Sequence, residues 1–137
     1  MAALDPVLIL CGGRGTRLRE RTESIPKALV EIGARPILWH VISIYAAQGF
    51  TRFLLLTGYR GELIEDWARR TDWPEGVEVD CLDTGLETPT GGRIKLAEER
   101  IEGPFSATYA DGVADIDLAA LARFHDEGDA LASVTVV

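Results

Sequence analysis

The chain has 137 residues, of which 47% are hydrophobic and 26% are charged, a composition typical of one globular domain with its own core. Its formal net charge of −8 argues against a nucleic-acid-binding surface, because such surfaces are rich in lysine and arginine. No apolar stretch approaches the ~20 residues of a membrane-spanning helix, and the first apolar run lacks the basic flank of a signal peptide. We therefore expect a cytoplasmic protein without membrane or nucleic-acid partners, in which Cys11 and Cys81 are reduced, packed thiols.

Short apolar runs alternate with segments of helical periodicity along the chain. The apolar runs predict buried strands at residues 7–11, 53–57, 77–82, 106–110 and 131–137. The last run reaches Val137 without a turn or a polar tail. We therefore expect residues 1–137 to be part of a domain that is truncated at its C-terminal end.

Four helices are expected between these strands, at residues 36–48, 61–70, 91–101 and 117–126. Pro36 lies in the first turn of the first helix and Gly49 follows its end, which are the positions that these residues favour. Asp117 is the expected N-cap of the last helix. The apolar residues expected to face inward are Leu63, Ile64, Trp67, Ile94, Ala97, Ile101, Leu118, Leu121 and Phe124.

Alternation of strands and helices predicts an α/β fold with a Rossmann-like, mostly parallel sheet and helices on both faces. Ligands of such sheets bind beyond the carboxyl ends of the strands. The glycine-rich segment after Leu10, Asp111 and the segment after Leu82 all lie at such strand ends.

The first strand runs into a glycine-rich turn, Cys11-Gly12-Gly13-Arg14-Gly15-Thr16-Arg17, and Lys27 follows ten residues after Arg17. Such a turn exposes backbone N–H groups, and glycine lets them approach a phosphate closely. Arg17 and Lys27 add positive charge beside them. This segment predicts a site for a nucleoside triphosphate.

The spacing of the turn excludes two common glycine loops. A Walker loop ends in Gly-Lys followed by Ser or Thr, whereas Gly15 is followed by Thr16 and Arg17. A dinucleotide loop needs a third glycine where Leu18 stands, and an acidic residue after the second strand, where Gly58 stands.

A second glycine-containing segment, Thr88-Pro89-Thr90-Gly91-Gly92-Arg93, follows the third strand. Its unobstructed backbone could offer N–H and C=O groups to the flat edge of a base. The alternative is an ordinary helix start with Thr90 as the cap.

The motif Gly-Gly-x-Gly-Thr-Arg-Leu, followed by Pro-Lys-Ala-Leu-Val, resembles the signature of the sugar-1-phosphate nucleotidyltransferases. With Asp-Thr-Gly, Thr-Gly-Gly-Arg and Tyr109-Ala110-Asp111-Gly112, the chain is most similar to the branch of glucose-1-phosphate cytidylyltransferases. The resemblance implies the fold of nucleotide-diphospho-sugar transferases, CTP and a sugar 1-phosphate as substrates, Mg²⁺ as cofactor, and a possible homo-oligomer. Residues 1–137 would be the nucleotide-binding part.

The resemblance also implies roles for individual residues. Arg17, Lys27 and Asp111 would be catalytic, and Asp111 would bind Mg²⁺; Asp115 could join it there or instead cap the next helix. The second metal-binding aspartate and the sugar site would lie beyond Val137. The residues implied to bind the nucleotide are Leu10, Cys11, Gly12, Gly13, Arg14, Gly15, Thr16, Arg17, Lys27, Thr88, Gly91, Gly92, Arg93 and Ala110.

Other functions remain open from sequence alone. The chain could be a non-catalytic nucleotide-binding or regulatory domain. A transferase of the same family could also use GTP, UTP or dTTP, because a few contacts decide the choice of base.

Overall fold

Four of the predicted strands form one parallel sheet in the computed structural model, which describes residues 4–14 and 24–136. The sheet has the order β5-β4-β1-β6. Its strands are β1 (Val7–Leu10), β4 (Arg52–Thr57), β5 (Glu78–Asp83) and β6 (Ser106–Tyr109). The described helices are α2 (Ile37–Ala47), α3 (Gly61–Arg70), α4 (Thr90–Leu96) and α5 (Leu118–Glu127), with the 3₁₀ turns η3 (Lys27–Leu29) and η4 (Glu98–Arg100).

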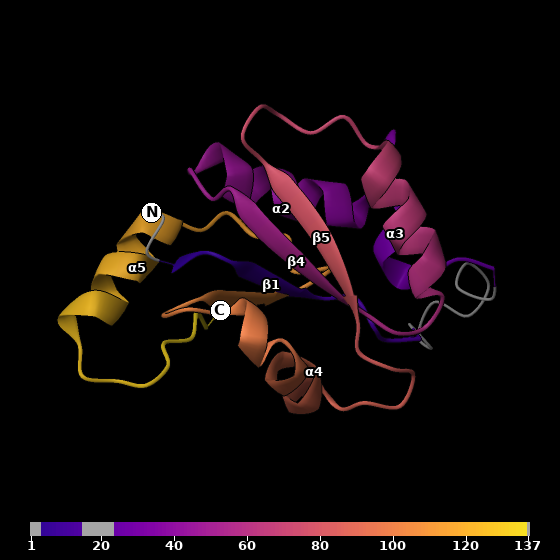
Figure 1. Ribbon diagram of the computed structural model, residues 1–137. Coiled ribbons are helices and arrows are strands. Elements are labelled where there is room, and N and C mark those ends of the chain that lie inside the picture. The colour runs from indigo at the N-terminus through magenta and orange to yellow at the C-terminus, as the bar shows by residue number, and fades with distance from the viewer. Residues whose placement is uncertain (1–3, 15–23, 137) are drawn as a thin grey trace.

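Helices cover both faces of the sheet, as predicted. Figure 1 shows α2 and α3 on one side of the strands and α4 on the other. Successive residues of a strand point to opposite faces, so Ile9 joins the core under α2 and α3 while Leu8 joins the core under α4. Both side chains are fully buried. This arrangement confirms the α/β class.

The order of the strands places a switch point between β1 and β6. From β1 the chain adds β4 and then β5 on one side, and later adds β6 on the other side of β1. In the register of the sheet, Leu10 at the end of β1 lies beside Tyr109 at the end of β6. The glycine turn and Asp111 therefore leave the sheet side by side, where ligands of open α/β sheets bind.

Two predicted elements are wrong. Residues 131–136 form no strand, and the side chains of Leu131 and Val136 are exposed. A run of β-branched residues needs a neighbouring strand to supply hydrogen bonds, and none lies beside it in residues 4–14 and 24–136. The helix predicted at 91–101 ends at Leu96, after which Ala97 donates its N–H to Ile94 and the chain tightens into η4.

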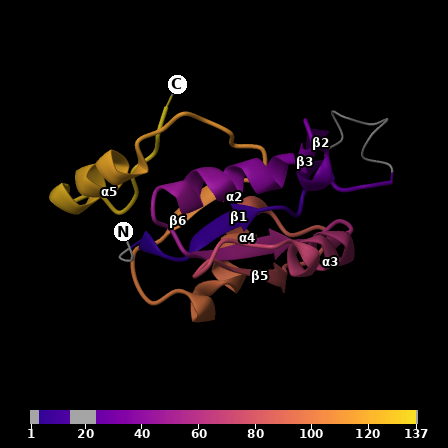
Figure 2. The same cartoon turned by 90° about the horizontal axis from the view of Figure 1, so that it is seen from above.

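The other helices agree with their predictions within two residues at each end. Asp117 is the N-cap of α5, since its carboxylate accepts the N–H of Ala120 at 2.9 Å. Phe124 was expected inward but is 70% exposed, because α5 turns Leu118 and Ala122 toward the core instead. Figure 2 shows α5 at one end of the molecule, beyond α2.

A small antiparallel pair, β2 (Glu31–Ile32) and β3 (Arg35–Pro36), was not predicted. It precedes α2 and lies close to η3, which carries Lys27. Cys11 is buried and Cys81 half-buried, and both are free thiols as expected. Burial raises the pKa of both thiols, that of Cys81 to about 11. No helix in the described part of the chain is long and apolar enough to cross a bilayer.

Candidate functional site

A cavity of about 330 Å³ opens at the carboxyl ends of β1 and β6. Its wall comes from four stretches: the glycine turn, η3, the start of α4 and the segment after β6. The lining residues are Leu10, Cys11, Gly12, Gly13, Lys27, Ala28, Thr88, Pro89, Thr90, Arg93, Tyr109, Ala110 and Asp111. The fold thus gathers at one place segments that are distant in the sequence.

Most of the residues predicted to bind the nucleotide or metal line this cavity. Arg14, Gly91 and Gly92 do not, although they flank residues that do. Gly15, Thr16 and Arg17 lie outside the described residues. Sequence reasoning missed four lining residues, Ala28, Pro89, Thr90 and Tyr109, each of which adjoins a predicted one along the chain.

Lys27 and Asp111 meet in the cavity as an ion pair. Lys27 Nζ lies 2.6 Å from Asp111 Oδ2, and both side chains are partly exposed, at 36% and 40%. Lys27 is held by η3, which begins directly after the buried Pro26. Asp111 follows Ala110, whose N–H continues the ladder of β6 by donating to the Leu10 carbonyl. The backbones of Lys27 and Asp111 are therefore held by the fold, while their paired charged groups stay partly exposed to the cavity.

The loop after β5 is held in shape by its own hydrogen bonds. Gly85 adopts φ +87°, a left-handed conformation that glycine tolerates best, and its N–H donates to the Asp83 carboxylate at 2.9 Å. The Thr88 hydroxyl donates to the Thr84 carbonyl. Capping by Thr90 is wrong, since Pro89 occupies the N-cap position of α4 and Thr90 is its first residue.

An exposed ion pair connects the two glycine segments. Arg14 Nη2 lies 2.9 Å from Glu87 Oε1, and the two side chains are 55% and 82% exposed. An exposed pair of this kind contributes only about 0–1 kcal/mol to stability. An anion that carries more charge than Glu87 could therefore replace it as the partner of Arg14.

Arg93 is the most deeply buried of the site's cations within the described residues. It comes from α4, is 7% exposed, and directs its guanidinium beneath the ends of the strands. None of the ion pairs found among the described residues includes Arg93, and its partners are instead carbonyl and hydroxyl oxygens. The cavity wall thus contains a buried positive charge as well as the Lys27–Asp111 pair.

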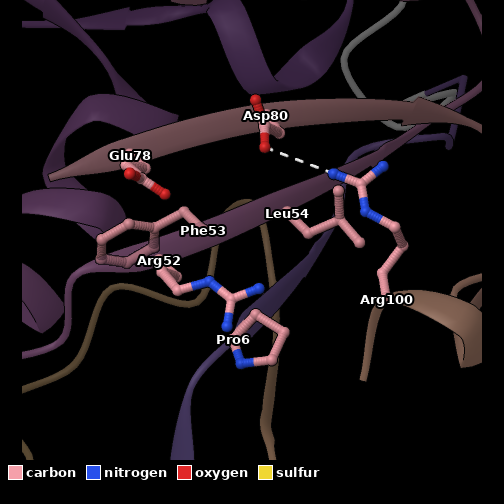
Figure 3. A pocket seen from close by; sticks show the side chains of 7 residues that line it. All are labelled: Pro6, Arg52, Phe53, Leu54, Glu78, Asp80 and Arg100. Carbon is pink, nitrogen blue, oxygen red and sulfur yellow. Dashed lines mark hydrogen bonds and ion pairs between the residues drawn. The ribbon is translucent and has the colours of Figure 1, made fainter. Parts of the chain in front are cut away.

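A second hollow at the opposite end of the sheet has only about 20 Å³ (Figure 3). It lies among Pro6, Arg52 and Glu78, at the amino ends of the strands, and beside it Arg100 Nη2 approaches Asp80 Oδ2 at 3.3 Å. This volume holds about one water molecule. The large cavity is therefore the candidate site.

Mg²⁺ is commonly held in proteins by one or two carboxylates together with phosphates of the substrate. The described residues contain no cluster of three or more His, Cys, Asp or Glu side chains that could hold a metal alone. Asp111 supplies one accessible carboxylate at the cavity, while Asp115 does not line it. This donor set fits a metal ion that arrives with phosphates rather than one held by the protein alone.

The parallel sheet and the cavity at its switch point define an α/β protein with a candidate ligand site at the carboxyl ends of its strands. The profile of the family described as nucleotidyl transferase matches residues 6–137. The chain therefore belongs to the nucleotidyl transferase family.

Two relatives and one solved structure illustrate the relationship. A probable glucose-1-phosphate cytidylyltransferase of Bacillus subtilis is 40% identical over 148 residues, covering 93% of this chain and 58% of that protein. The glucose-1-phosphate cytidylyltransferase of Salmonella typhimurium is 37% identical over 150 residues, with the same two shares. The crystal structure of HddC from Yersinia pseudotuberculosis complexed with GMP-PN superposes with a TM-score of 0.73 at 31% identity, covering 88% of this chain and 52% of HddC.

These matches confirm the predicted family resemblance and the fold of nucleotide-diphospho-sugar transferases. The chain spans 58% of the length of the two cytidylyltransferases that it matches.

Proposed function

We propose that this chain is the nucleotide-binding part of a transferase that moves CMP from CTP to a sugar 1-phosphate, glucose 1-phosphate being the favoured acceptor. The products are a nucleotide-diphospho-sugar and pyrophosphate. The observation that carries the proposal is the cavity at the switch point, where the glycine turn, Lys27 and Asp111 come together. A polyanionic substrate needs this combination of backbone N–H groups and mobile cations.

The reaction requires no covalent intermediate with the protein. An oxygen of the sugar 1-phosphate attacks the α-phosphorus of CTP, the bond to the β-phosphate oxygen breaks, and pyrophosphate leaves. The protein aligns the two phosphates and stabilises the charge that grows on their oxygens. Lys27, which lines the cavity, is assigned to the α-phosphate, and Arg17, which lies outside the described residues, is assigned to the departing pyrophosphate.

Asp111 is the residue that would hold Mg²⁺, together with phosphate oxygens of the substrates. Bound there, Mg²⁺ would supply charge neutralisation on the phosphates that face each other. Lys27 would then exchange the Asp111 carboxylate for a phosphate oxygen, since both side chains are partly exposed and line the same cavity.

The choice of cytosine is supported by the similarity to two glucose-1-phosphate cytidylyltransferases, one of them described as probable, at 40% and 37% identity. A guanine nucleotide is the alternative with a specific observation behind it, because HddC, at 31% identity, was crystallised with GMP-PN. Within the chain, Thr88, Pro89 and Thr90 line the cavity at the start of α4, where a base edge would be read by backbone groups.

Calorimetry with CTP, GTP, UTP and dTTP in the presence of Mg²⁺ tests the proposal. We expect CTP to bind the 137-residue chain more tightly than GTP and to raise its melting temperature by mass action. Equal affinity for all four nucleotides would contradict the choice of cytosine. If none of the four nucleotides binds, the proposed function is overturned.

A non-catalytic nucleotide-binding role is distinguished by pyrophosphate release. Release from CTP that depends on glucose 1-phosphate supports the transferase. Tight CTP binding without release for any sugar 1-phosphate, measured on a protein that also contains the sugar-binding part, supports the non-catalytic role.

A further inference from the structure

We propose that Arg93 is a positioning residue, which clamps the loops after three neighbouring strands and thereby sets the shape of the phosphate-binding turn. This inference rests on the proposed function for its nucleotide readout, but the clamp itself is a property of the fold. It assigns Arg93 a role through the protein backbone rather than through contact with the nucleotide alone.

The guanidinium bridges the last residue of β4 and the segments that follow β1 and β5. Nη1 donates to the carbonyls of Thr57 at 3.2 Å and Gly85 at 2.7 Å, and to the Thr84 hydroxyl at 2.7 Å. Nη2 donates to the carbonyls of Gly12 at 3.4 Å and Leu86 at 3.3 Å. Because β5, β4 and β1 are adjacent in the sheet, one planar cation ties three strand ends together.

The bond to Gly12 orients the phosphate-binding turn. The Gly12 carbonyl also accepts the N–H of Tyr59 at 3.2 Å. Two donors, Arg93 and Tyr59, therefore hold this carbonyl pointing into the protein. The peptide bond that follows is trans, and in a trans peptide the N–H points opposite to the carbonyl. Holding the Gly12 carbonyl inward therefore directs the N–H of Gly13 away from Arg93, toward the side where an anion would bind.

The chain makes room for the guanidinium with two glycines. A Cβ added at Gly12 would lie 2.2 Å from Arg93 Nη1, and one at Gly58 would lie 2.6 Å from the same atom. Real Cβ atoms essentially never come so close. A Cβ at Gly13, by contrast, would meet nothing within 4 Å. The three nearest atoms to a Cβ at Gly12 all belong to Arg93, whereas at Gly58 the Gly85 carbonyl oxygen, at 2.5 Å, is nearer still. The steric demand at Gly12 thus coincides with the position of Arg93.

The charge of Arg93 adds to this role. Four carbonyl dipoles and one hydroxyl satisfy the guanidinium, and no carboxylate among its described partners neutralises it. A buried cation with neutral partners leaves a positive field at the cavity wall. That field favours a bound triphosphate.

A melting-temperature cycle tests the clamp without any nucleotide. We expect Gly12→Ala to lower the melting temperature by about 5 °C or more, as a steric clash in a buried loop does. The matched change Gly13→Ala should leave it almost unchanged. In an Arg93→Ala background, Gly12→Ala should cost less than half as much, because the clashing guanidinium is gone. Additive losses in the double variant would overturn the clamp.

Affinity for CTP with Mg²⁺ tests the consequence for the site, at a temperature where every variant is folded. We expect Arg93→Lys to lose tenfold or more, since an ammonium group keeps the charge but cannot span the three loops. Thr84→Val should also weaken binding several-fold, although Thr84 is buried and does not line the cavity. Methylguanidinium should restore the affinity of Arg93→Ala, and methylammonium should not.

These readouts separate the possible failures. Unchanged affinity in Thr84→Val together with loss in Arg93→Lys would mean that Arg93 acts only by direct contact, which overturns the positioning role. No CTP binding by the unaltered chain would overturn the proposed function, while the melting-temperature cycle would still decide the clamp.

Discussion

At the scale of single residues, two of the described cations at the site pair with partners that a substrate could replace. Lys27 rests on Asp111, and Arg14 rests on Glu87, both in partly exposed positions. Such pairs are held weakly, at about 0–1 kcal/mol each, because water screens them. Phosphate oxygens and a metal ion can therefore replace these partners at little cost. Arg93 differs from these two cations, because it is buried and its guanidinium is held by several oxygen acceptors of the protein.

Asp111→Asn tests the assignment of the metal ligand. We expect Mg²⁺ to raise the CTP affinity of the unaltered chain and to have little effect on the variant, because the amide lacks the charge that Mg²⁺ prefers. In EDTA the variant should bind CTP at least as tightly, since a carboxylate that repels phosphate is gone and Lys27 is released. Calorimetry with and without Mg²⁺ measures both effects.

Asp117→Asn is the matched control for this change. It also exchanges a carboxylate for an amide, but it caps α5 outside the cavity, and Asn caps helices as well as Asp does. A variant at Asp111 that keeps the full response to Mg²⁺ would remove Asp111 from the metal site.

At the scale of elements, the sequence predicted those strands and helices whose positions are set by their own residues and the residues next to them. The runs around Ile9 and Leu55 are short, apolar and followed by turns, so the buried strands and the cavity at their ends could be placed. Asp117 stands directly before a helical pattern, so its cap was recognisable. Lys27 and Asp111 were found because each belongs to a motif of the family that the chain resembles, and both line the cavity.

Other features of the structure could not be predicted, because they depend on segments that are brought together only by folding. The run 131–137 has strand-forming residues but no neighbouring strand among the described residues. The pair β2–β3 has strands of two residues, too short to show any period. The clamp made by Arg93 depends on three loops that come together only in the folded sheet, so the residue could be picked out from its motif but its role could not.

Gln48, at the end of α2, holds α5 against the body of the protein. Its amide donates to the Ile116 carbonyl at 3.0 Å and accepts the N–H of Leu118 at 2.8 Å. We expect Gln48→Ala to weaken the docking of α5 by roughly 1–2 kcal/mol, because two partly buried hydrogen bonds are lost. Faster hydrogen exchange throughout α5 measures this loss, and CTP affinity should not change because α5 does not line the cavity.

Asp117→Ala provides the comparison for Gln48. It removes the cap inside α5 without touching the contact with α2, so it should speed exchange only in the first turn. If Gln48→Ala leaves exchange in α5 unchanged, the amide does not dock the helix.

At the scale of the whole molecule, the two edges of the sheet differ in charge. β5 carries Glu78, Asp80 and Asp83 along one edge, whereas β6 at the other edge is Ser-Ala-Thr-Tyr and carries no charge. Charged side chains keep an edge strand from pairing with another molecule. Near β6, Tyr109 is 57% exposed, so this side of the described sheet combines an open edge with apolar surface.

We therefore predict that the 137-residue chain self-associates through β6. Light scattering should show a mass that rises with protein concentration, and rises further with salt, because salt screens the repulsion between molecules of net charge −8. Ala107→Lys places a charge on an exposed position of β6 and should reduce the association. Ala130→Lys adds the same charge at an exposed position outside the sheet and should reduce it much less. Equal effects of the two substitutions would mean that net charge alone controls the association, and a monomer at all concentrations would show that the β6 edge is protected in solution.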